Sequence, residues 1–386
     1  MVEGKITLDH TLSEKQLEFL EDSLNECFPT CRLKLLPNHL AFHIDDSESI
    51  QNLESNLKKL LFISRGLDQK KSIFTQISDY NFSKDPMDLL LSKEEVVPFG
   101  EGLFVFQGEF LRIFKSLNSH FLNVAITEFN AIEQENPSVW PIDLFNKVNY
   151  FKEFPQHASL IAGIRKDHKE LSSFSSQSEK YKKQNSVKLN ESFDDCKYGL
   201  QPAVCDTCYY ILKNKKDIQN TIYTIYNKVF RNEFSKHNSL DRLPVFSVRD
   251  IMFVGDKQFV LHQRQLLIEK LTEFLKKTGL NCSIEVADDP FFSTSLEKKL
   301  FQFQFESKYE ILAFIPYLNK RIAIGSINLH LDSFSSAFNF SREGSEIYSG
   351  CIGIGFERLL LAFYSQFGND VSKWPSSLLK LIDLES

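Results

Sequence analysis

Two hydrophobic patterns alternate along residues 1–95. Apolar side chains occupy every second position in residues 4–9 and 31–45, which predicts β-strands. Residues 13–27 and 49–61 repeat apolar side chains at helical spacing, and Ser13 is a favoured N-cap for the first of these helices. Residues 1–95 are therefore expected to form a small α/β domain, and nothing in it points to chemistry.

After residue 95 a second series of strand-like and helical segments begins. Residues 104–106 are strand-like, residues 109–121 have helical spacing, and residues 124–127 are strand-like again. The pattern breaks over residues 166–198, which are rich in Ser, Lys, Asn and Gln. This composition is typical of a mobile insertion or a long loop.

Composition narrows the class of protein. The chain has 386 residues, of which 42% are hydrophobic and 36 are Phe, so it can bury a large core in one or two domains. No apolar run approaches the length that spans a bilayer, so no membrane partner is expected. The net charge of −6 disfavours a broad nucleic-acid surface without excluding a local patch. Seven cysteines and an N-terminus without a signal-peptide core favour a reduced, cytoplasmic setting.

Residues 353–358 carry the most informative motif. Gly353 and Gly355 lack a Cβ, so a strand there can pass close to a flat ligand. Arg358 then begins an apolar helix, and the N–H donors of its planar guanidinium suit a phosphate group. The pattern suits an adenine with a phosphate tail, although such glycines also occur where strands simply pack tightly.

A second motif, predicted as a β-hairpin, offers the same kind of chemistry. Arg231 and Glu233 follow a strand-like run, and Arg242 and Phe246 come after a polar loop. Two arginines suit phosphates, the carboxylate suits an amine, and the aromatic ring suits stacking. The alternative is a hairpin with ordinary surface ion pairs.

Together the two motifs resemble motifs 2 and 3 of the class II aminoacyl-tRNA synthetases, in their seryl branch. The resemblance implies that Arg231 holds the α-phosphate of ATP during catalysis and that Arg358 holds its γ-phosphate end. It also implies that Glu233 and Phe246 hold adenine, with Arg242 as a second phosphate contact. The resemblance runs from about residue 96 to residue 386 and implies an α+β catalytic domain there, with an antiparallel β-sheet flanked by helices. It also implies ATP and Mg²⁺ as cofactors. Residues 109–127 match motif 1, which implies a homodimer.

The resemblance extends to a metal site. The atypical seryl-tRNA synthetases of methanogens, and the related amino acid:[carrier protein] ligases, bind zinc through Cys, Glu and Cys at places that match Cys205, Asp250 and Cys351. Zn²⁺ bound by two thiolates and a carboxylate, with one position open, is typical of a catalytic site. Asp250 is one methylene shorter than the family's glutamate. A metal-free site and a structural zinc knuckle that uses Cys205 and Cys208 remain as alternatives.

Three polar residues lie on strand-like segments that flank the amino acid and the metal of ATP in class II enzymes. They are Glu310, with an implied catalytic role, and Ser326 and Asn328, with an implied role in cofactor binding. The alternative is that they are ordinary polar residues of strands.

The absence of a coiled-coil pattern determines which molecule we expect to accept the activated amino acid. Residues 1–95 lack the heptads of the coiled coil that holds tRNA in bacterial seryl-tRNA synthetases. We therefore expect a ligase that activates a small amino acid, such as glycine or alanine, with ATP. The acceptor would be the thiol of a phosphopantetheinylated carrier protein, and no tRNA partner is expected. The alternatives are a catalytically silent paralogue and a seryl-type aminoacyl-tRNA synthetase whose divergent tRNA-binding domain is residues 1–95.

Overall fold

The structure is a computed structural model. It describes residues 2–8, 11–13, 16–17, 20–21, 23–24, 28, 31–44, 47–64, 72–79, 82, 84–178, 187, 192–233, 239–287 and 306–383.

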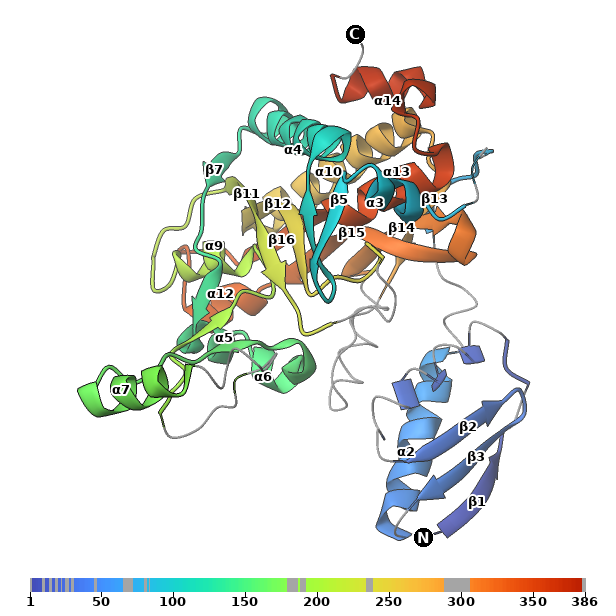
Figure 1. The fold of residues 1–386 in the computed structure, drawn as a ribbon, viewed down its shortest axis with the longest axis vertical. Helices are drawn as coiled ribbons and strands as arrows, with labels where there is room; N and C mark the ends of the chain where they lie inside the picture. The colour runs from blue at the N-terminus through green and yellow to red at the C-terminus, as the bar shows by residue number, and fades with distance from the viewer. Residues whose placement is uncertain are drawn as a thin grey trace.

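The N-terminal unit is a three-stranded antiparallel sheet with a helix. Strands β1 (Val2–Thr7), β3 (His39–Ile44) and β2 (Arg32–Leu36) lie in that order, and helix α2 (Ser47–Ser64) follows them. Buried leucines, including Leu40, form its separate core. The strands and the second helix are as predicted, whereas the helix predicted at residues 13–27 lies partly outside the described residues. Figure 1 shows this unit apart from the larger sheet.

An eight-stranded sheet forms the centre of the larger unit. Its order is β4-β13-β14-β15-β16-β12-β11-β7, and all neighbours are antiparallel except β11 and β7. The strands are β4 (Ser72–Gln76), β7 (Ile132–Gln134), β11 (Thr221–Phe230), β12 (Val245–Asp256), β13 (Cys282–Val286), β14 (Lys308–Ile315), β15 (Lys320–Leu331) and β16 (Ile347–Gly355). The predicted α+β class is confirmed. Because β4 precedes residue 96, the chain joins this sheet earlier than the division predicted at residues 95/96.

Helices cover both faces of the large sheet (Figure 1). Side chains alternate along β12, so Ile251 and Phe253 face one core while Met252 and Val254 face another. The first core is covered by α4 (Gly108–Phe129), α10 (Lys257–Thr278), α13 (Phe356–Phe367) and α14 (Ser376–Leu381). The second is covered by α5 (Ile142–Lys147), α9 (Asp206–Tyr210) and α12 (Ser333–Phe338).

Shorter elements connect these layers. They are α3 (Met87–Ser92), β5 (Val96–Gly100), β6 (Leu103–Phe106), β8 (Val139–Pro141), α6 (Tyr150–Glu153), β9 (Leu160–Ile161), α7 (His168–Ser176), β10 (Tyr198–Leu200) and the 3-10 helices Pro155–His157, Pro316–Leu318 and Val371–Lys373. In the segment predicted as an insertion, Asp167 caps α7 by accepting a hydrogen bond from the Glu170 amide. Residues 179–186 and 188–191 lie outside the described residues.

The strand predicted at residues 124–127 is wrong, because α4 continues through it to Phe129. Ala125 is fully buried in the core, so packing outweighs the β-propensity of its neighbours. Asn130 ends the helix in a left-handed conformation, and the strand that follows is β7. The homodimer implied by this motif stays a prediction. Among the described residues, no helix combines the length and apolarity that crossing a membrane requires.

Candidate metal and nucleotide site

Three elements bring the predicted metal ligands together. Cys205 precedes α9, Asp250 lies on β12 and Cys351 lies on the neighbouring strand β16. Their ligand atoms all lie within 4.8 Å of one another, and all three residues are buried. The two Sγ atoms are 3.9 Å apart.

The chemistry of this group fits a zinc ion. Burial raises the pKa of Asp250, and the nearby Cys351 thiol raises it further. The hydrogen bond between the two sulfur atoms raises the pKa of Cys205 and lowers that of Cys351. A cation would stabilise such a buried acidic group. Zn–S bonds of about 2.3 Å in a tetrahedral site place two sulfurs about 3.8 Å apart, close to the distance observed.

Gly353 makes room for the carboxylate of Asp250. It pairs with Asp250 across β12 and β16, and a Cβ on Gly353 would lie 2.5 Å from Asp250 Oδ1. The glycine predicted for a flat ligand therefore also has a packing role. Gly355 differs, since a Cβ there would first meet the Ile324 carbonyl at 3.6 Å, an ordinary contact.

Gly353→Ala is expected to lower stability and to disturb the metal site. Overpacking of this kind typically costs about 1–3 kcal/mol, so thermal denaturation should show a melting temperature lower by several degrees. Gly355→Ala is the matched control, because its methyl group meets no short contact. Equal melting temperatures for both variants would contradict this account of Gly353.

The predicted nucleotide residues lie where β11 ends and β12 begins. Arg231 lies over the Phe246 ring, with 5.4 Å from Cζ to the ring centroid. Arg242 Nε lies 3.5 Å from Glu233 Oε2, while His157 Nδ1 lies 3.3 Å from Glu233 Oε1. One guanidinium group therefore contacts the aromatic ring, and the other contacts the Glu233 carboxylate.

Arg358 joins the same group from the start of α13. Its Nε donates to the Asp241 carbonyl at 2.6 Å, and its Nη1 donates to the Ala323 carbonyl at 3.2 Å. Burial lowers the pKa of Arg358, and the charges of Glu233 and Arg231 also act on it. The guanidinium is thus fixed by two backbone oxygens.

One hydrogen bond links the nucleotide residues to the metal ligands. Arg231 Nε donates to the Pro202 carbonyl at 3.2 Å, on the segment that leads into Cys205. The two predicted sets are therefore connected through residues 202–205.

The remaining predicted residues lie on neighbouring strands. Ser326 pairs with Gly353 on one side and with Glu310 on the other. Asn328 Nδ2 lies 3.6 Å from Cys351 Sγ and donates to Ser326 Oγ at 3.1 Å. Glu310 Oε1 lies 3.3 Å from Lys308 Nζ. Paired residues share a face of the sheet, so this row extends the site across β14, β15 and β16.

Sequence reasoning missed three residues beside this site. His157 contacts Glu233, Asp206 is buried next to Cys205, and His330 Nε2 lies 3.9 Å from Cys351 Sγ. Burial lowers the pKa of His157 and raises the pKa of Asp206 to about 6. Proximity in sequence to Cys205 was the available signal for Asp206.

Cys208 points away from the metal ligands. Its Sγ lies 3.0 Å from Gln134 Oε1 on β7, and it is absent from the group formed by Cys205, Asp250 and Cys351. The geometry therefore does not favour the knuckle alternative.

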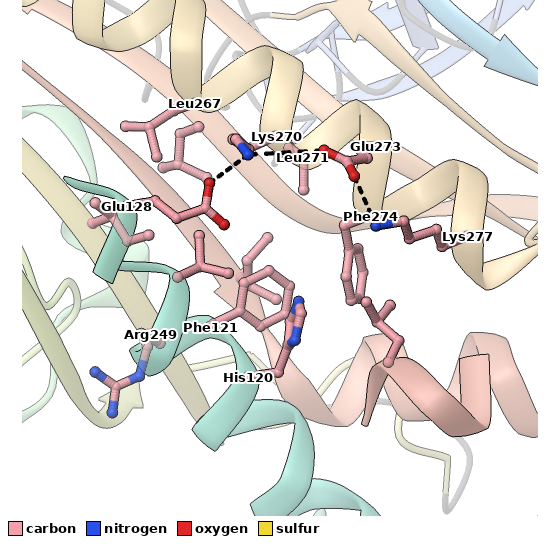
Figure 2. A pocket seen from close by; sticks show the side chains of 15 residues that line it. His120, Phe121, Glu128, Arg249, Leu267, Lys270, Leu271, Glu273, Phe274 and Lys277 are labelled. Carbon is pink, nitrogen blue, oxygen red and sulfur yellow. Dashed lines mark hydrogen bonds and ion pairs between the residues drawn. The ribbon is translucent and has the colours of Figure 1, made fainter. Parts of the chain in front are cut away.

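Figure 2 shows a separate pocket between α4 and α10, on the other face of the sheet. Apolar side chains such as Phe121 and Phe274 line it, and Lys277 pairs with Glu273 at 2.7 Å on its rim. Arg249 and Ile251 line it from β12, whereas Asp250 between them faces the metal group. This pocket is not part of the predicted site.

Comparisons with known proteins point to the same fold. Residues 187–367 match the family model of the tRNA synthetase class II core domain (G, H, P, S and T). The type-2 serine–tRNA ligase of Methanococcus maripaludis is 24% identical over 324 residues, which are 80% of this chain and 63% of the relative. The relative from Methanocaldococcus jannaschii is 22% identical over 92% of this chain and 73% of its own length. The chain thus spans less than two thirds of the Methanococcus relative.

Solved structures share the fold. The M. kandleri SerRS in complex with A. aeolicus tRNASec has a TM-score of 0.69 and 17% identity, covering 99% of this chain and 77% of that one. The Pyrococcus horikoshii seryl-tRNA synthetase complexed with ATP has a TM-score of 0.61 and 12% identity, covering 87% and 80%.

These findings correct two expectations. The relatives are serine–tRNA ligases, so the expected carrier-protein ligase is wrong. The expectation of no tRNA partner is also wrong, because a structure that matches 99% of this chain is a tRNA complex. Missing heptads argue against a coiled coil, but they do not exclude another tRNA-binding domain. Residues 187–367 thus match the class II aminoacyl-tRNA synthetase core domain, and the chain has the corresponding fold.

Proposed function

We propose that the chain activates serine with ATP and transfers it to tRNA. The observation that carries this proposal is the hydrogen bond from Arg231 to the Pro202 carbonyl, which connects the arginine group to the segment that leads into the three buried ligands. The names of the relatives supply serine and tRNA.

ATP would bind at the arginine group. Phe246 stacks on adenine and Glu233 accepts from its amino group, while Arg231 and Arg358 contact the phosphates, with Mg²⁺ as counterion. The serine carboxylate attacks the α-phosphorus, the bond to the β-phosphate breaks, and pyrophosphate leaves. Fixed positive charge favours this step because charge builds on the phosphate oxygens in the transition state.

The amino acid would bind at the buried ligands. Cys205, Asp250 and Cys351 would hold zinc, which supplies a Lewis acid for the amino group of serine. Ser326 and Asn328 lie beside Cys351 and can orient the substrate. A ribose hydroxyl at the end of tRNA then attacks the activated carbonyl carbon, and AMP leaves. We assign tRNA binding to residues 1–95.

Serine-dependent ATP–pyrophosphate exchange tests the first step. We expect exchange with serine that exceeds the exchange with glycine or alanine, since the relatives are serine–tRNA ligases. Radiolabelled serine should then become attached to tRNA in a form that ribonuclease releases. Absence of exchange with every amino acid in the presence of zinc would contradict the proposal and favour a silent paralogue, for which Asp250 is the supporting feature.

A further inference from the structure

We propose that His330 is a positioning residue of the metal centre, which donates a hydrogen bond to the Cys351 thiolate. This inference rests on the metal site of the proposed function. His330 Nε2 lies 3.9 Å from Cys351 Sγ, and the imidazole is only partly buried.

The backbone turns His330 toward this position. The pairing of β15 with β16 shifts register between Leu329 and Leu331, so His330 lies at an irregularity in the ladder. Leu331 has a φ of 53°, a left-handed conformation that is uncommon for residues other than glycine. Bulges often redirect a side chain beside an active site.

Aromatic side chains then fix the ring. Tyr209 Oη lies 3.0 Å from His330 Nδ1, and the Tyr209 ring stacks on Phe334 at 4.0 Å. Phe334 also meets the His330 ring edge-on at 4.8 Å. When the tyrosine hydroxyl donates to Nδ1, the proton of a neutral imidazole is on Nε2, which faces the sulfur.

The same contacts connect the metal ligands. Tyr209 lies one turn after Cys205 on α9, and His330 lies beside Cys351. The hydrogen bond between Tyr209 and His330 therefore connects α9, which follows Cys205, to β15, which pairs with the strand of Cys351. Loss of a comparable partner of a metal ligand typically lowers metal affinity by about 10- to 100-fold.

The test measures metal binding by full-length protein. Competition with a chromophoric chelator should show zinc affinity about 10- to 100-fold lower in His330→Leu, with a smaller loss in Tyr209→Phe. His330→Gln keeps an N–H donor and should recover part of the affinity. His262→Leu, on the exposed side of α10, is the matched control and should bind zinc as wild type does.

The absorption spectrum of cobalt-loaded protein gives a second measurement, which a loss of stability alone would not change. The thiolate-to-cobalt charge-transfer band of Co²⁺-loaded protein should shift in His330→Leu and stay in place in His262→Leu. Wild-type affinity together with an unshifted band in His330→Leu would overturn this inference alone and leave the proposed function standing. Wild-type protein that binds neither metal would overturn both the inference and the zinc site on which it rests.

Discussion

Arg358→Ala is expected to lower serine-dependent ATP–pyrophosphate exchange by roughly two or more orders of magnitude. The Asp241 and Ala323 carbonyls fix the Arg358 guanidinium before any substrate binds. A preorganised charge contributes more than a mobile one, because little reorganisation is needed when charge develops on the phosphates. Arg231→Ala should have an effect of the same order, since Arg231 lies in the same group.

Two further variants make this prediction specific. Arg358→Lys keeps the positive charge but loses the planar fork, so it should restore only part of the exchange. Arg342→Ala is the control, because Arg342 pairs with Asp256 at the opposite end of β12. Exchange at the wild-type rate in folded Arg358→Ala protein would contradict the assigned role of Arg358.

Local patterns predicted the elements that carry the site. The antiparallel pair β11–β12 follows from two strand-like runs around a polar loop, and α13 follows from the apolar run after Arg358. These signals lie within a few residues of one another, so sequence periodicity is sufficient to detect them. The metal ligands are different, because residues 205, 250 and 351 lie far apart in the chain. Only the family resemblance grouped them.

Long-range contacts explain what was missed. The pairing of β4 with β13 joins residues that are far apart in sequence, so no local pattern placed β4 in the large sheet. His330 lies beside Cys351 only through the pairing of β15 with β16, at an irregularity in that pairing. The expectation of no tRNA partner was wrong for another reason: the absence of one type of tRNA-binding element was taken as the absence of all.

Cys205→Ser and Cys351→Ser are each expected to remove the zinc that wild-type protein should hold at about one ion per chain. Each variant deletes one of two thiolates, which are the strongest ligands of the group. Their Sγ atoms lie 3.9 Å apart and both residues are buried, so each substitution removes a thiolate from the centre of the group. Metal analysis after dialysis measures the zinc content, and circular dichroism reports whether the variants fold.

Cys208→Ser is the matched control for these variants. Cys208 is buried like the other two cysteines and lies soon after Cys205 in the chain, but its Sγ contacts Gln134 on β7. A substitution there perturbs a buried cysteine without deleting a ligand, so the protein should keep its zinc. Equal zinc loss from Cys208→Ser and Cys205→Ser would show that the metal lies at a different set of residues.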